Sequence, residues 1–100
     1  MYKILLVCNA GMSTSMLVQR MEKAAEADGI DAKIIALPIT DAATQLDEWD
    51  VIMLGPQVRH ELKGLKTKTT TPIEVIEMRD YGMMNGENVL KAAIKVIDSK

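Results

Sequence analysis

The sequence predicts an α/β protein with an open four-stranded parallel sheet, strand order 2-1-3-4, and helices on both faces. Four apolar, β-branched runs alternate with segments whose apolar residues recur at helical spacing. The first two runs are continuously apolar, which is typical of strands covered on both faces. Strands and helices in strict alternation fold into a three-layer sandwich with right-handed crossovers.

The strands are expected at residues 3–7, 32–37, 51–54 and 73–76, each rich in aliphatic side chains. Four strands cannot close an eight-stranded barrel, so the sheet must be open. The expected topology is flavodoxin-like. Its switch point lies between the first and third strands, and ligands bind there, outside the carboxyl ends of the strands.

The first helix is expected from Ser13 onward, because the apolar residues that follow share one helical face, and Gly29 is its expected stop. A shorter helix is expected over residues 41–49, with Asp41 as the N-cap. The last helix covers residues 85–98 and has a long apolar stripe. Between the two lies a helix of one to three turns, marked by Val58, Leu62 and Leu65.

Length and composition describe one globular domain over residues 1–100, with 48% hydrophobic and 26% charged residues. The net charge of -2 argues against nucleic-acid binding, which needs a basic surface. A single cysteine excludes an internal disulfide and a cysteine-rich zinc site, and a free thiol fits the reducing cytoplasm. We expect no metal or cofactor, and a monomer, because no large apolar face is left once the helices cover the sheet.

Three segments are expected to meet at the carboxyl edge of the sheet. Cys8 ends the first strand, residues 55–57 follow the third, and residues 80–82 follow the fourth. The carboxyl ends of parallel strands lie at one edge, so these segments converge although they are far apart in sequence.

Cys8 begins a run of small and hydroxyl-bearing residues that leads into the first helix. Such a run directs backbone N–H groups and a helix N-terminus at one spot, which binds anions and favours a thiolate. It has one glycine and no lysine, so it is not a nucleotide-binding P-loop. The alternative is a buried, inert cysteine. The candidate phosphate-binding residues are Asn9, Ala10, Gly11, Met12, Ser13, Thr14 and Ser15.

Other polar side chains near this edge could be either solvated surface residues or functional ones. His60 is the only histidine and is expected to be a solvated surface residue. Arg59, Lys63 and Lys66 recur at helical spacing and form either a solvated face or a docking patch for an acidic or phosphorylated partner. Asp80 fits a polar turn better than a catalytic acid. The weaker candidates for contact with partners at this edge are Gln57, Arg59 and Tyr81.

Three segments together resemble a known family. They are K-I-L-L-V-C-N-A-G-M-S-T-S at residues 3–15, V-I-M-L-G-P-Q-V-R at 51–59, and I-E-M-R-D-Y-G-M-M-N-G at 76–86. They are similar to the IIB components of the lactose/cellobiose/chitobiose family of the bacterial phosphoenolpyruvate-dependent sugar phosphotransferase system. The likeness runs the full chain in length and order of elements.

The resemblance implies that Cys8 is phosphorylated. It would receive the phosphoryl group from a histidine of a IIA partner and pass it to a sugar bound by the membrane IIC partner, with residues 9–15 as the phosphate-binding loop. The protein would then be a cytoplasmic phosphotransferase, peripherally associated with the permease. Cellobiose, chitobiose and lactose all remain open as the sugar.

The main alternative is a hydrolase like the low-molecular-weight tyrosine phosphatases, with Cys8 as nucleophile and Asp80 as general acid. Those enzymes carry Cys-x5-Arg, and here Thr14 stands in the place of the arginine. Without a guanidinium to stabilise hydrolysis, a phosphocysteine would persist, which suits a carrier. A redox protein would need a resolving cysteine. A plain binding module with an inert Cys8 is the last alternative.

Overall fold

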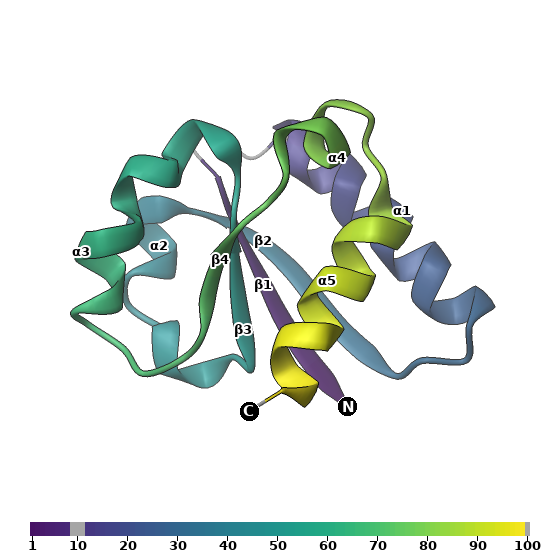
Figure 1. The fold of residues 1–100 in the computed structure, drawn as a ribbon, viewed down its shortest axis with the longest axis horizontal. Coiled ribbons are helices and arrows are strands. Elements are labelled where there is room, and N and C mark those ends of the chain that lie inside the picture. The colour runs from purple at the N-terminus through teal and green to yellow at the C-terminus, as the bar shows by residue number, and fades with distance from the viewer. Residues whose placement is uncertain (9–11, 100) are drawn as a thin grey trace.

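The computed structural model describes residues 1–8 and 12–99, and of Met12 and Ser13 the backbone only. This part of the chain contains a four-stranded sheet in the order β2-β1-β3-β4, and neighbouring strands pair in parallel (Figure 1). The predicted sheet and strand order are confirmed. The strands are β1 (Tyr2–Cys8), β2 (Ala32–Pro38), β3 (Val51–Leu54) and β4 (Ile73–Val75).

Helices and short 3₁₀ segments connect the strands and cover the sheet. The 3₁₀ segments of the described chain are η1 (Leu46–Glu48) and η2 (Pro56–Glu61). Its α-helices are α1 (Met12–Ala27), α2 (Ile39–Ala42), α3 (Leu62–Lys66), α4 (Met78–Gly82) and α5 (Gly86–Asp98).

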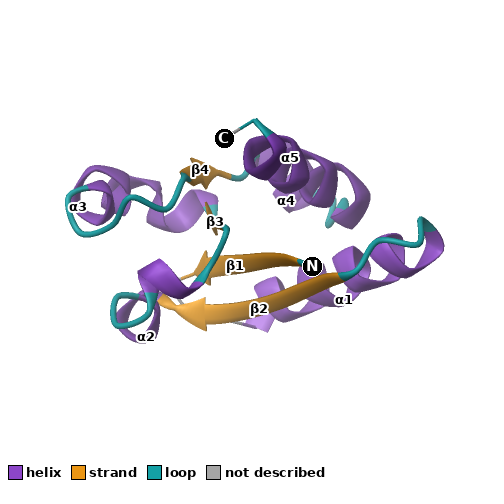
Figure 2. Ribbon diagram, turned by 90° about the horizontal axis from the view of Figure 1, so that it is seen from below, coloured by secondary structure: helices purple, strands orange, loops and turns teal. Residues whose placement is uncertain are grey.

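The sheet is the middle layer, with a hydrophobic core on each side. Along β1, Ile4 and Leu6 pack in one core with α1 and α5, whereas Leu5 and Val7 pack in the other with residues of α2, α3 and the 3₁₀ segments. Figure 2 shows α1 and α5 on one side of the strands and α2 and α3 on the other. Because successive side chains of a strand point to opposite faces, a continuously apolar strand supplies both cores.

The C-terminal end of α1 follows the prediction made for Gly29. Its φ is +69°, in the left-handed region that glycine adopts without strain. The N–H of Ile30 donates to the carbonyl of Ala25 at 2.8 Å, and the N–H of Gly29 donates to that of Glu26 at 3.2 Å. This pair of bonds is a Schellman motif, which ends the helix and turns the chain toward β2.

The helix predicted over residues 41–49 is only partly correct. The chain forms α2 and then, separately, η1, and Asp41 lies inside α2 while Pro38 occupies the N-cap position. The Thr44 hydroxyl donates to the carbonyl of Asp41 at 2.8 Å. Such local side-chain bonds compete with the helical backbone pattern, which explains why the helix is interrupted here.

The turn predicted at residues 80–82 is instead part of α4. The N–H of Tyr81 donates to the carbonyl of Glu77 at 2.9 Å, and the Tyr81 side chain is buried. Aspartate and glycine favour a turn, but burial of the neighbouring ring outweighs that local preference. The helix places Tyr81 against the carboxyl edge of the sheet.

Candidate functional site

Cys8 lies at the carboxyl end of β1, where the sequence predicted it. Its side chain is 2% exposed, and Sγ donates to the carbonyl oxygen of Leu37 in the neighbouring strand at 3.8 Å. Backbone pairing places Cys8 opposite Pro38, at the end of the β1–β2 ladder. The predicted loop residues Asn9, Ala10 and Gly11 lie outside the described residues, as do the side chains of Met12 and Ser13.

The first turn of α1 begins at Met12, directly after this loop. Thr14 is 1% exposed, and its hydroxyl lies 3.3 Å from that of Tyr81, close enough for one to donate to the other. Ser15, by contrast, is exposed to solvent. The structure describes two of the hydroxyl side chains that were predicted to bind phosphate, those of Thr14 and Ser15. The Thr14 hydroxyl contacts Tyr81 of α4.

The end of β3 is fixed against the end of β1. The N–H of Gly55 donates to the carbonyl of Val7 at 2.8 Å. A Cβ built on Gly55 would lie 3.0 Å from Oε1 of Gln57, 3.4 Å from the Val7 carbonyl oxygen and 3.7 Å from Cε1 of Tyr81. The distances to Val7 and Tyr81 are ordinary van der Waals separations, and only the side-chain tip of Gln57 would have to move. The segment after β3 and the ring of Tyr81 thus lie beside the end of β1.

A pocket of ≈ 590 Å³ brings together Gln57, Arg59 and Tyr81, the three weaker candidates at this edge. His60 and the exposed Met78 also line it. His60 has a side chain 70% exposed, and Nε2 lies 3.5 Å from a carboxylate oxygen of Glu61, which agrees with the predicted solvated residue. Sequence reasoning did not single out Met78, although it opens α4 just past the end of β4.

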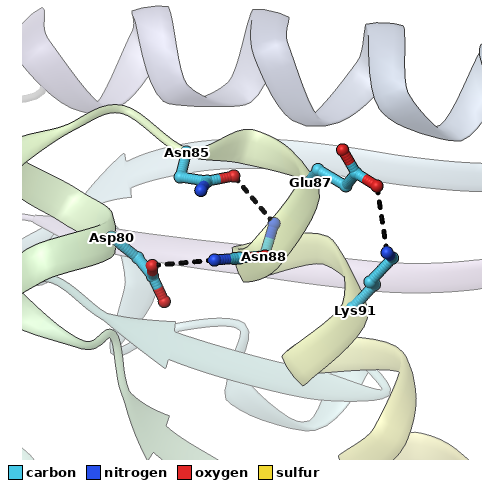
Figure 3. Close-up of polar contacts among 5 residues, drawn as sticks. All are labelled: Asp80, Asn85, Glu87, Asn88 and Lys91. Atoms are coloured by element: carbon cyan, nitrogen blue, oxygen red, sulfur yellow. Dashed lines mark hydrogen bonds and ion pairs between the residues drawn. The ribbon is translucent and has the colours of Figure 1, made fainter.

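Asp80 of α4 forms a hydrogen bond with the next helix, α5. Figure 3 shows its carboxylate beside Asn88 of α5, whose Nδ2 donates to Oδ1 of Asp80 at 3.1 Å. The side chain of Asn85 accepts from the N–H of Asn88 at 3.1 Å and so caps α5. Asp80 thus helps to join α4 to α5, which is the work of a structural residue.

Two chemical properties of the described residues bear on function. They contain no group of three or more histidine, cysteine, aspartate or glutamate side chains arranged to hold a metal ion. None of the helices among residues 12–99 is long and apolar enough to cross a membrane.

Comparison with known proteins identifies the family to which the chain belongs. A family model described as the lactose/cellobiose-specific IIB subunit of the PTS system matches residues 3–92. The galactose-specific EIIB component of Lactococcus lactis subsp. cremoris (strain MG1363) is 46% identical over 99 residues, with 90% of this chain and 91% of that protein covered. The oligo-beta-mannoside-specific EIIB component of Bacillus subtilis (strain 168) is 35% identical over 100 residues, with 97% of each covered. The chain belongs to this IIB family.

Solved structures agree with the assignment. The solution structure of a cellobiose-specific phosphotransferase IIB component from Borrelia burgdorferi has a TM-score of 0.83 and 49% identity, covering 99% of this chain and 94% of that one. A lactose-specific IIB domain from Streptococcus pneumoniae has a TM-score of 0.84 at 16% identity, covering 94% and 95%, which shows a shared fold.

As a IIB component, the protein is a phosphoryl carrier of a sugar phosphotransferase system and acts as a phosphotransferase. Family membership favours this function over the hydrolase alternative. The bond from Asn88 to Asp80 points the same way, because the acid that a hydrolase would use is engaged with α5.

Proposed function

We propose that Cys8 is the residue that carries the phosphoryl group. It accepts the group from a histidine of a IIA partner and passes it to a sugar bound by a membrane IIC partner. The observation that supports this most directly is the position of the sole cysteine, at the carboxyl end of β1 and just before the first turn of α1.

In the first step the sulfur of Cys8 attacks the phosphorus of the donor phosphohistidine. An S–P bond forms as the N–P bond breaks, and the thiol proton ends on the histidine nitrogen that loses the phosphoryl group. In the second step a sugar hydroxyl attacks the same phosphorus. An O–P bond forms, the S–P bond breaks, and the hydroxyl proton returns to sulfur. Phosphoryl transfer of this kind depends chiefly on positioning and charge stabilisation.

The first turn of α1 supplies that stabilisation. The N–H groups at the start of a helix have no partner within it, and in the described part of α1 these belong to residues 12–14, just after the cysteine loop. The helix dipole alone contributes about 0.3–1 kcal/mol at an exposed site, so directed N–H bonds to the phosphoryl oxygens must contribute most. Residues 9–11 complete the phosphate-binding loop.

Three exposed methionines lie on or next to the helices α1 and α4 and form the proposed docking surface; of these, Met78 lines the pocket itself. Met16 of α1 is 52% exposed, Met78 of α4 is 62% exposed, and Met83, just after α4, is 64% exposed. Large apolar side chains exposed near a functional site are typical of protein interfaces. Methionine suits two different partners in turn, because its flexible side chain adapts to each.

The substrate proposed for the complete system is a sugar of the cellobiose, chitobiose or lactose type. The Lactococcus lactis relative named as a cellobiose-specific EIIB component, 46% identical over 99 residues, supports cellobiose among these sugars. The carrier would work in the cytoplasm beside the permease, and as a monomer.

The decisive test measures the intact mass of the protein after incubation with phosphoenolpyruvate, Enzyme I, HPr and a IIA protein of this family. We expect a gain of one phosphoryl group on the wild type and none on Cys8→Ser. Equal labelling of both proteins would place the phosphoryl group elsewhere. No labelling, together with hydrolysis of p-nitrophenyl phosphate that needs Cys8, would instead support the phosphatase alternative.

A further inference from the structure

The hydroxyls of Thr14 and Tyr81 form a buried contact that the proposed transfer steps do not use. Their oxygens lie 3.3 Å apart, and the residues are 1% and 8% exposed. In this environment a hydrogen bond has little competition from water, and loss of the Tyr81 hydroxyl would deprive the buried Thr14 hydroxyl of this bond. Because both residues are buried, the contact restricts how far the two side chains can move relative to each other.

The two residues belong to different parts of the proposed site. Thr14 is the third residue of α1, in the turn whose N–H groups face the phosphoryl group in the proposed function. Tyr81 lies on α4, which follows β4. The bond thus ties the anion-binding turn to an element that begins 66 residues later in the chain.

The ring of Tyr81 packs in the core that contains Ile4 and Leu6 of β1, and it also lies near Gly55. Its Cε1 lies 3.7 Å from the position that a Cβ on Gly55 would occupy, and Gly55 donates to the carbonyl of Val7 at 2.8 Å. Val7 is the residue before Cys8 in β1. Tyr81 therefore connects the core beside β1 with Thr14 of α1.

We infer that Tyr81 is a positioning residue for phosphoryl transfer, acting through Thr14. Its hydroxyl fixes the first turn of α1 relative to the end of β1, so that the N–H groups of the turn meet the phosphoryl oxygens as the S–P bond forms. This inference rests on the proposed role of Cys8. Because catalysis is sensitive to displacements of about 1 Å, loosening the turn should slow transfer more than it destabilises the fold.

The test compares Tyr81→Phe, Thr14→Val and the double variant with wild type, using phosphorylated IIA as the donor. The rate at saturating donor should fall about 10- to 100-fold in each single variant. KM for phosphorylated IIA should stay unchanged, because the docking surface is intact. The double variant should be no slower than either single one, as expected for two residues that act through one bond. Thr14→Ser keeps the hydroxyl and should keep most of the rate.

The possible results distinguish a positioning role of Tyr81 from a packing role and from failure of the proposed function. If the wild type is phosphorylated on Cys8 and Tyr81→Phe transfers at the wild-type rate, the positioning role is wrong and the proposed function stands. Losses that multiply in the double variant, or a lower Tm without a slower rate, also overturn it, because they describe packing alone. If Cys8→Ser and wild type are labelled equally, the proposed function fails first, and the inference fails with it.

Discussion

The thiol of Cys8 makes a contact that its phosphorylated form cannot make. Sγ donates to the carbonyl oxygen of Leu37 at 3.8 Å, across the β1–β2 ladder. A sulfur bonded to phosphorus has no proton to donate, and its phosphoryl oxygens are acceptors like the carbonyl. At the residue scale, phosphorylation should therefore change the hydrogen bonding of β2 as well as the surroundings of Cys8 itself.

We predict that phosphorylation of Cys8 changes the carbonyl ¹³C shift of Leu37, because that oxygen loses the hydrogen bond from Sγ. Carbon-detected NMR is the suitable measurement, since the next residue, Pro38, has no N–H. The carbonyl of Leu5, deep in β1, should barely move, and Cys8→Ser treated in the same way should show neither change. An unaltered Leu37 shift in fully phosphorylated protein would contradict the prediction.

Among the elements, α1 and α5 come into close backbone contact at Gly86, the first residue of α5. A Cβ built there would lie 2.5 Å from the carbonyl carbon of Arg20 and 2.5 Å from the backbone nitrogen of Met21. Those are backbone atoms, which cannot turn aside as a side-chain tip can. Only glycine allows this crossing, and the crossing holds both helices on the same face of the sheet.

We predict that Gly86→Ala destabilises the protein by about 1–3 kcal/mol, because α5 must move away from α1. Gly64→Ala in α3 is the matched control. Nothing lies within 4 Å of its added methyl group, so we expect a gain of about 0.5–1 kcal/mol. Urea unfolding followed by the fluorescence of Trp49, the single tryptophan, measures both. Equal effects of the two substitutions would refute the close crossing.

The strands and their order could be predicted from the sequence because burial on both faces leaves continuous apolar runs, as in β1. The position of Cys8 followed from the same rule, since a strand end fixes its edge of the sheet. The secondary structure of residues 41–49 and 80–82 could not be predicted in the same way. One depended on a local hydroxyl bond at Thr44, and the other on the burial of Tyr81.

The contact between Thr14 and Tyr81 lay beyond sequence reasoning for a different reason. The residues are 67 positions apart, and no periodicity relates them. Sequence patterns predicted that the segments after β1 and β4 meet at one edge, but not which atoms touch. Gln57 and Arg59 were proposed on the same basis, and the structure places them in one pocket with Tyr81.

At the scale of the whole molecule, the two edges of the sheet differ in character. The carboxyl edge carries Cys8 and the pocket, whereas the start of β1 and the end of α5 come together at the other edge (Figure 1). There the hydroxyl of Tyr2 donates to the carboxylate of Asp98, with oxygen distances of 3.1 and 3.3 Å. This bond joins the first strand to the last helix.

The bond between Tyr2 and Asp98 predicts a change in stability at alkaline pH. The hydrogen bond to Asp98, with smaller effects of burial and of the Asp98 charge, raises the pKa of Tyr2 above its ordinary value of about 10. Above that value the unfolded chain loses the tyrosine proton first, so stability falls as pH rises through the folded pKa. The advantage of wild type over Tyr2→Phe should be constant below about pH 9 and should shrink as the pH rises past 10.

Urea unfolding of the two proteins at pH 8 and at pH 11 measures that advantage. Lysines titrate in the same range, but they are identical in both proteins and cancel from the difference. Asp98→Ala should lose the same pH-dependent part of its stability. A gap between wild type and Tyr2→Phe that widens at high pH would show that the Tyr2 hydroxyl is not held by Asp98.

The docking surface formed by Met16, Met78 and Met83 makes the last prediction. Each side chain exposes more than half of its surface, and an interface that covers one of them gains from its burial. Replacing Met78 by serine should raise KM for phosphorylated IIA about fivefold, which corresponds to about 1 kcal/mol of lost burial. The rate at saturating donor and the Tm should stay close to wild type, because Met78 is 62% exposed and packs little in the free protein.

Met78→Leu is the matched control, since it keeps an apolar side chain of similar volume and should keep the wild-type KM. The pattern is the opposite of that expected for Tyr81→Phe, which should lower the rate and leave KM alone. The two substitutions therefore separate docking from positioning at adjoining residues of one pocket. A wild-type KM in both Met78→Ser and Met83→Ser would show that IIA approaches Cys8 over another surface.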